Sequence, residues 1–245
     1  MAMKIYNCRF APTTNGSIHL GHVFVALVNE FEAHRSGGKF TVRFDDAQEW
    51  RIYRQSRNEI NRMKQIIIDD FEWLGIKVDD YMSDSEIEMD VKAYLLLLNK
   101  GELAITKMVV VNNSPEATSN NILYYPYHPW LTAQKVIADW MIDINYLIRG
   151  EDLITESSLY AYFCEIWRIP QPRQVYLPRL NTFDGNEVSK TVDFVTISQM
   201  REKGYKPENI YSILIDACLK NKDAFWTIDN IKSQPRLGEA WSKKS

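Results

Sequence analysis

Residues 9–22, RFAPTTNGSIHLGH, are the stretch from which the fold is inferred. Residues 4–8, just before it, are expected to form a short strand. After it, apolar residues recur at helical spacing, which predicts a helix from residue 20 toward residue 34. A strand, a tight turn with glycine and then a helix are typical of an α/β sheet that presents a helix N-terminus to an anion.

Two histidines follow this turn at positions i and i+3, so they share one side of the helix's first turn. Imidazoles beside free backbone N–H groups can donate hydrogen bonds to phosphate oxygens, and Gly21 between His19 and His22 leaves room for a base or ribose. The pattern therefore indicates a nucleotide site. The simpler alternative is a helix start with two chance histidines.

A pair of carboxylates closes the next predicted strand, residues 39–44, in the sequence RFDDAQEWR. In a parallel sheet the ends of neighbouring strands lie side by side, so Asp45 and Asp46 are expected to face the same crevice as the histidines. A carboxylate there can hold an ammonium group through charge-assisted hydrogen bonds. The alternative is that one or both only cap a helix.

Composition excludes several classes of protein. The chain has 245 residues, is 45% hydrophobic and contains no long apolar run, so no membrane span is expected. A signal-peptide pattern is missing as well, and we expect a cytoplasmic protein. The three cysteines, Cys8, Cys164 and Cys218, form no CxxC spacing, which predicts reduced thiols and no zinc site. The net charge of −3 gives no support for RNA binding.

The histidine stretch resembles the HIGH signature of class I aminoacyl-tRNA synthetases, and its flanks resemble the RFxP…GxLHxGH pattern of the glutamyl/glutaminyl subgroup. RGED at residues 149–152 is a further match to that subgroup. VSKT at residues 188–191 resembles the second signature, KMSKS. The resemblance implies a Rossmann-type α/β domain with a mostly parallel sheet, a short insertion between its halves and a helical C-terminal part.

The resemblance also implies which residues form the site. ATP, with Mg²⁺, would lie across the turn, and a lysine would stabilise the leaving pyrophosphate. The expected ATP-binding residues are Thr13, Gly16, His19, Gly21, His22, Ser189 and Lys190, of which His19, His22 and Lys190 would be catalytic. The expected amino-acid-binding residues are Arg9, Asp45, Leu131, Lys135 and Arg149.

Two arginines directed at one side chain favour glutamate as the substrate, because an arginine can form a bidentate pair with a carboxylate. For Arg149 the alternative is a structural ion pair with Glu151, Asp152 or Asp143. The chain departs from the subgroup in the pocket, where Leu131 replaces a tyrosine and Lys135 replaces another polar residue. It departs again in the lysine signature, where Glu187 replaces the first lysine.

The expected organisation is a first Rossmann half at 1–104, a connective insertion at 105–131, a second half with the lysine loop at 132–192 and a helical segment at 193–245. Helices are predicted at 53–74, 85–100, 156–167 and 207–220, a strand at 175–178 and a hairpin between 107–111 and 122–125. Aromatic residues of the insertion either pack it onto the domain, the favoured reading, or stack on nucleobases.

These observations favour an enzyme that activates an amino acid as its adenylate and passes it to a tRNA or a tRNA-like acceptor. We expect a monomer resembling truncated glutamyl-tRNA synthetases without an anticodon-binding domain. A small amine or a carrier protein is an alternative acceptor. The alternatives from other classes are a non-catalytic nucleotide- or tRNA-binding paralogue and a plain nucleotidylyltransferase, which would not need RGED.

Overall fold

The structure is a computed structural model that describes residues 4–46, 56–87, 90, 129–179 and 196–220. Within them, one five-stranded sheet has the order β3-β2-β1-β4-β5, and every recorded pairing is parallel. The strands are β1 (Cys8–Phe10), β2 (Phe40–Phe44), β3 (Asp80–Ser83), β4 (Tyr146–Gly150) and β5 (Arg173–Leu177). This order, which reverses between β1 and β4, confirms the Rossmann-type α/β prediction.

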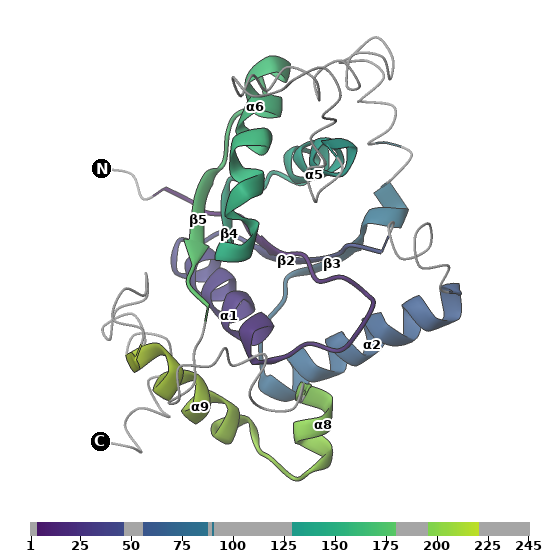
Figure 1. Cartoon of the computed structure of the whole chain (residues 1–245), viewed down its shortest axis with the longest axis vertical. Helices are drawn as coiled ribbons and strands as arrows, with labels where there is room; N and C mark the ends of the chain where they lie inside the picture. Colours follow the sequence, from purple (N-terminus) through teal and green to yellow (C-terminus); the bar gives the residue numbers. More distant parts are fainter. Residues whose placement is uncertain (1–3, 47–55, 88–89, 91–128, 180–195, 221–245) are drawn as a thin grey trace, which may run out of the picture.

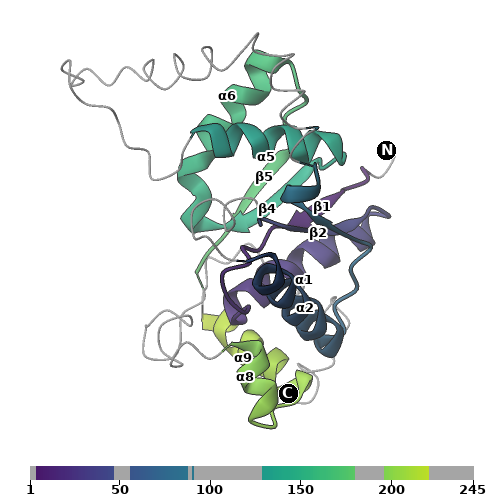
Figure 2. The same ribbon diagram turned by 90° about the vertical axis from the view of Figure 1, so that its right-hand side faces the viewer.

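Helices cover both faces of the sheet (Figure 1). They are α1 (Leu20–Arg35), α2 (Arg57–Leu74), α5 (Pro129–Met141), the 3₁₀ helix η2 (Glu151–Glu156), α6 (Ser157–Trp167), α8 (Ile197–Glu202) and α9 (Pro207–Lys220). Figure 2 shows α5 and α6 on one side of the strands, and α1 and α2 on the other. Helices α8 and α9 pack outside α1 and α2.

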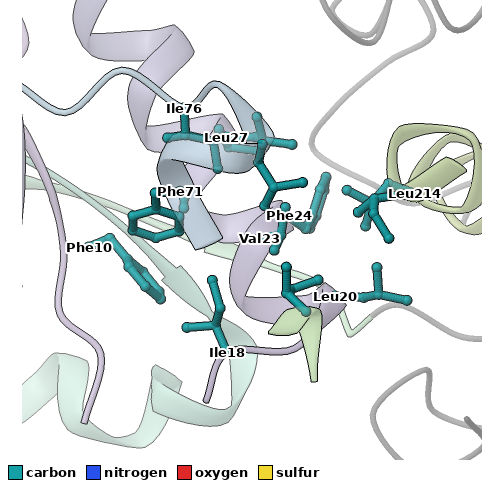
Figure 3. Packing of buried hydrophobic residues seen from close by; sticks show 14 of the residues in the cluster. Phe10, Ile18, Leu20, Val23, Phe24, Leu27, Phe71, Ile76 and Leu214 are labelled. Atoms are coloured by element: carbon teal, nitrogen blue, oxygen red, sulfur yellow. The ribbon is translucent and has the colours of Figure 1, made fainter. Parts of the chain in front are cut away.

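Side chains on the central strands alternate between two hydrophobic cores. In β1, Cys8 and Phe10 join the larger core with α1 and α2, and in β4 Tyr146 and Ile148 do the same. Leu147 instead joins the smaller core with α5 and α6. Figure 3 shows the larger core, where Phe10 and Phe71 lie near the inner face of α1. Successive strand residues point to opposite faces, so charged residues between these apolar ones face α5 and α6.

Several sequence predictions are confirmed. Helix α1 spans Leu20–Arg35 and α9 spans Pro207–Lys220, close to the predicted bounds. The first strand lies at Cys8–Phe10, later than predicted. Just before it, the Asn7 N–H donates to the side chain of Asn145 at 2.9 Å instead of to the backbone of a neighbouring strand. Strand β3 and the helices α5, η2 and α8 were not predicted, and the hairpin at 107–111 and 122–125 lies outside the described residues.

Helix α8 ties the C-terminal part to the rest of the domain. The backbone N–H of Ile197 donates to the carbonyl of Ile18, in the turn that precedes α1, at 2.9 Å. On the neighbouring helix α2, the Asp70 carboxylate is fully buried, and the Arg201 guanidinium of α8 lies 3.5 Å from it. The N-terminal turn and the C-terminal helices are therefore one packed unit. None of the helices in the described ranges is long and apolar enough to cross a membrane.

Substituting Gly38 with alanine should destabilise the fold by about 2–3 kcal/mol, because a Cβ at this position would collide with the backbone carbonyl of Tyr6. Urea unfolding followed by circular dichroism measures the change. Gly16→Ala is the matched control, since a Cβ there meets no atom within 4 Å. Equal stability of the two variants would contradict the close approach.

Substituting Asp70 with asparagine should raise the Tm at pH 7. Burial raises the pKa of Asp70 to about 6, and the Arg201 guanidinium only partly opposes this rise. Because the folded state binds the proton of Asp70 more tightly than the unfolded state does, Asp70 adds to the free energy of unfolding below its ordinary pKa of 3.8. That contribution is lost as the pH rises through 6. The gap between variant and wild type should therefore narrow from pH 7 to pH 4 in thermal scans. Asp69→Asn is the control, and a lower Tm for Asp70→Asn at pH 7 would refute the argument.

Candidate active site

The turn before α1 holds its two histidines in a defined arrangement. His19 is the N-cap of α1, and its Nδ1 accepts the N–H of Gly21 at 3.1 Å. His22 completes the capping box by accepting the His19 N–H on its own Nδ1 at 3.4 Å. The two rings stack with their centroids 3.8 Å apart. The histidines thus take the place of the Ser or Thr and the Glu or Gln of a usual capping box, and each holds the other's ring in position.

This arrangement also sets the protonation of the rings. Burial, together with the neighbouring His19, lowers the pKa of His22 to about 3, so His22 is neutral at pH 7. A neutral imidazole whose Nδ1 accepts a hydrogen bond carries its proton on Nε2. His22 therefore carries its proton on Nε2, beside the N-terminus of α1, where an anion is favoured.

Asp45 lies at the end of β2, directly beside this turn. Its N–H donates to the Pro12 carbonyl at 3.0 Å, and Asp45 forms a bridge with Thr13. Burial raises the pKa of Asp45, and the cations of Lys135 and Arg43 oppose the rise. A further cation placed against this carboxylate would stabilise its charged form.

Asp46 has a different, structural role. Its carboxylate accepts the N–H and hydroxyl of Ser85 at 2.8 and 2.6 Å, and pairs with Lys64 at 2.7 Å. Of the two carboxylates, Asp46 therefore behaves as the capping residue that the sequence allowed, at the start of the helical residues 84–87.

Beneath Asp45, a buried ion network covers the α5 side of the sheet. Arg9 of β1 donates from Nε and Nη2 to both oxygens of Asp139 at 2.9 and 3.0 Å. Arg43 of β2 donates to the same carboxylate at 2.6 Å, and pairs with Asp84 at 3.0 Å. Burial alone would raise the pKa of Asp139, but Arg43 and Arg9 lower it to about 2. The carboxylate of Asp139 therefore stays charged and holds two adjacent strands to α5.

Arg149 of β4 sits in a second cluster beside this network. Its Nη2 donates to Gln174 at 3.0 Å and to the Tyr176 hydroxyl at 2.8 Å, and its Nη1 donates to Glu156 at 3.3 Å. The guanidinium also lies over the ring of Tyr160, 5.6 Å from its centroid. Tyr160 in turn donates to Asp139 at 3.0 Å, so the two clusters are connected. The carboxylate that pairs with Arg149 is therefore that of Glu156, and not that of Glu151, Asp152 or Asp143, the partners considered from the sequence.

Leu131 and Lys135 lie one turn apart on α5, and both are half-buried. The Lys135 ammonium contacts both oxygens of Glu156, at 3.3 and 3.5 Å. Lys135 also acts on the charge of Asp45. Lys135 therefore links Asp45 to the cluster around Arg149 through its charge and through Glu156, and Leu131 lies one turn before it on the same helix.

The structure brings Arg9, Asp45, Lys135 and Arg149 to one end of the sheet, with the turn that bears His19 and His22 beside Asp45. Ser189, Lys190 and Glu187 lie outside the described residues, as do residues 105–128 of the predicted insertion. In the described ranges, no group of three histidine, cysteine or carboxylate side chains is placed to hold a metal ion. The expected absence of zinc stays a prediction.

Sequence reasoning missed several residues around these charged groups, namely Arg43, Asp84, Glu156, Tyr160, Gln174 and Tyr176. The sequence could have indicated Arg43, because it lies between Val42 and Phe44 in a strand that is buried on both faces. A buried arginine needs a counter-ion. Glu156 and Tyr160 are positioned by η2 and α6, and only the packed structure shows that they face β4.

Solved structures that share this fold include a glutamate tRNA ligase and a tyrosyl-tRNA synthetase. A glutamate tRNA ligase from Elizabethkingia meningosepticum, solved in complex with its amino acid, superposes with a TM-score of 0.64 at 16% identity, covering 86% of this chain and 61% of that one. A tyrosyl-tRNA synthetase from Aeropyrum pernix gives 0.53 at 15% identity, over 78% of this chain and 58% of that one. At this identity, the likeness shows the fold alone.

The sequence itself establishes the family. The model of the class I tRNA synthetase (E and Q) catalytic domain matches residues 6–106 and 107–235, so this chain belongs to that family. Among curated relatives, glutamate–tRNA ligase 1 of Rubrobacter xylanophilus is 25% identical over 84% of this chain, and the enzyme of Methanococcus maripaludis strain C5 is 22% identical over 91%. The chain spans about half the length of these relatives, 52% of each.

Substituting Asp139 with asparagine should destabilise the fold by about 3–5 kcal/mol, because Arg9 and Arg43 would stay buried without their shared counter-charge. Chemical denaturation measures the difference in free energy of unfolding. Asp143→Asn is a control two residues beyond the end of the same helix, where the residue has a left-handed backbone that asparagine tolerates, and should change stability by less than about 0.5 kcal/mol. A small effect at Asp139 would mean that the network is not needed to join β1 and β2 to α5.

Proposed function

We propose that the protein activates an amino acid, glutamate in the first instance, with ATP and transfers it to a tRNA or tRNA-like acceptor. An oxygen of the α-carboxylate attacks the α-phosphorus, the bond to the β-phosphate breaks, and pyrophosphate leaves. The observation that carries the proposal is the stacked pair of histidines that caps the start of α1, with the buried Asp45 after β2 and the buried Arg149 of β4 at the same end of the sheet.

The phosphates would lie against the start of α1. His19 and His22 donate from Nε2, and the helix N-terminus adds its N–H groups. Gly21 keeps this approach open, because a Cβ there would come within 3.0 Å of the His19 ring. Thr13, Gly16 and Ser189 complete the proposed ATP site. Lys190 would stabilise the charge that grows on pyrophosphate, and Mg²⁺ would accompany the triphosphate.

The amino acid would lie between β2 and β4. Asp45 takes the α-ammonium, which supplies the cation that a buried carboxylate favours. Arg149 takes the side-chain carboxylate. Arg9 uses its Nε and Nη2 for Asp139, so its contribution to substrate would come from Nη1. Catalysis comes from alignment and charge stabilisation, without a protein nucleophile.

The acceptor is proposed from the relatives, which are named glutamate–tRNA ligases. A small amine or a carrier protein would use the same adenylate. One observation favours a non-catalytic nucleotide- or tRNA-binding paralogue instead, namely Glu187 at the position of a signature lysine, because it adds negative charge where the triphosphate would lie.

The test of the proposed function is an ATP–pyrophosphate exchange screen over all amino acids, followed by acylation assays with total tRNA. We expect exchange that depends on glutamate. Exchange with no amino acid would favour the binding paralogue. Exchange without acylation of tRNA would point to a different acceptor.

Substituting Arg149 with alanine should abolish glutamate-dependent exchange, since the side-chain carboxylate would lose its main cation. Arg173→Ala is the control, because Arg173 lies at the other end of neighbouring strand β5, against the ring of Tyr146. Unchanged exchange in Arg149→Ala would remove Arg149 from the site.

A further inference from the structure

The two arginines assigned to the substrate differ in how firmly their own counter-ions hold them. Arg9 meets Asp139 through two hydrogen bonds of 2.9 and 3.0 Å, and Arg43 closes on the same carboxylate at 2.6 Å. Arg149 meets Glu156 through a single contact of 3.3 Å. Charge-assisted bonds between these groups are ordinarily about 2.7–2.9 Å long. The Asp139 pairs are therefore tight, and the Glu156 pair is loose.

Glu156 is also shared between two cations. Its Oε2 lies 3.3 Å from the Arg149 guanidinium, and its oxygens lie 3.3 and 3.5 Å from the Lys135 ammonium. Arg149 and Glu156 are each 3% exposed, whereas the Lys135 side chain keeps 19% of its surface in contact with solvent. A small movement toward Lys135 would let Glu156 leave Arg149 without losing a cationic partner.

Arg149 is otherwise held in place. Gln174 and Tyr176 accept from Nη2, and the rings of Tyr160 and Tyr176 lie 5.6 and 5.4 Å from its guanidinium carbon. No residue among those that the structure describes accepts from its buried Nε. Arg149 therefore keeps its position when Glu156 moves, and has donor capacity for a new carboxylate.

We propose that Glu156 is a resident counter-ion that occupies Arg149 until the side-chain carboxylate of the substrate displaces it, and that Lys135 receives the displaced carboxylate. Glu156 and Lys135 then determine specificity together. Glu156 competes with an acidic side chain, which lowers affinity for L-glutamate more than for L-glutamine, and Lys135 reduces that penalty. This inference rests on the assignment of Arg149 under the proposed function.

The first test is the Kd of L-glutamate and of L-glutamine, measured by calorimetry on the full chain, with the KM for each in pyrophosphate exchange. Glu156→Gln keeps an amide oxygen for Arg149 and Lys135 but removes the competing charge. We expect it to bind L-glutamate about tenfold more tightly, with little change for L-glutamine, since one like charge near the bound carboxylate is removed. Glu165→Gln, at an exposed position of α6, is the matched control and should change neither Kd.

The second test is a double-mutant cycle. Lys135→Met should weaken L-glutamate binding about tenfold in the wild-type background, because a displaced Glu156 would have no cation. The same substitution should have little effect when residue 156 is already neutral, so the two effects are non-additive. A role for Lys135 that does not involve Glu156 would cost the same in both backgrounds. Lys77→Met, at an exposed position, is the control.

These outcomes separate the inference from the proposed function. Unchanged or weaker L-glutamate binding by Glu156→Gln, additive effects in the cycle, or no L-glutamate binding by any of the variants would each overturn the inference. Tighter binding by Glu156→Gln without exchange in any variant would support the inference and refute adenylate formation. If the wild type catalyses exchange with other amino acids but none of the expected shifts in the Kd for L-glutamate is seen, adenylate formation is supported and the role of Glu156 as a resident counter-ion is refuted.

Discussion

The structure depends on one buried carboxylate. Asp139, on α5, neutralises arginines from two adjacent strands, and all three side chains are nearly or completely excluded from solvent. Two buried guanidinium groups without a counter-charge would carry a desolvation penalty that hydrophobic packing alone does not offset. With Asp139 in place, the face of the sheet toward α5 can be polar at its centre, while the opposite face is an ordinary apolar core.

That division between the two faces follows from the pleat of the strands. In β1 and β2, the residues on the α1 side are apolar and fill the larger core, and Arg9 and Arg43 lie between them on the other side. In β4, Leu147 and Arg149 follow the same rule, alternating with Tyr146 and Ile148. A domain can thus place three arginines near one another at the end of its sheet without opening its core. The strand order supports this, since β1 and β4 lie next to each other where the connections change direction.

The ion pairs in this region form two groups, which we call the inner and the outer level. The inner level, around Asp139, has short bonds and multiple partners and lies under the site. The outer level, where Glu156 contacts both Arg149 and Lys135, has longer contacts and reaches solvent through Lys135. The difference matters for function, because a ligand can compete only with pairs that are loose enough to exchange. The stacked histidines belong to the rigid level, since each Nδ1 accepts a backbone N–H and the two rings stack on each other.

The sequence by itself determined the fold class, the start of α1, the last described helix α9 and the placement of Asp45 beside the histidine turn. These features are local or periodic: a helix repeats its apolar residues, and parallel strands end at a common edge. Only the tertiary structure decided the partners of the charged residues. Asp46 pairs with Ser85 and Lys64 while Asp45 lies beside the histidine turn, and Arg149 pairs with Glu156, seven residues away, across the η2 turn. Ion pairs depend on which side chains the packed helices bring within a few ångströms, and sequence spacing does not specify that distance.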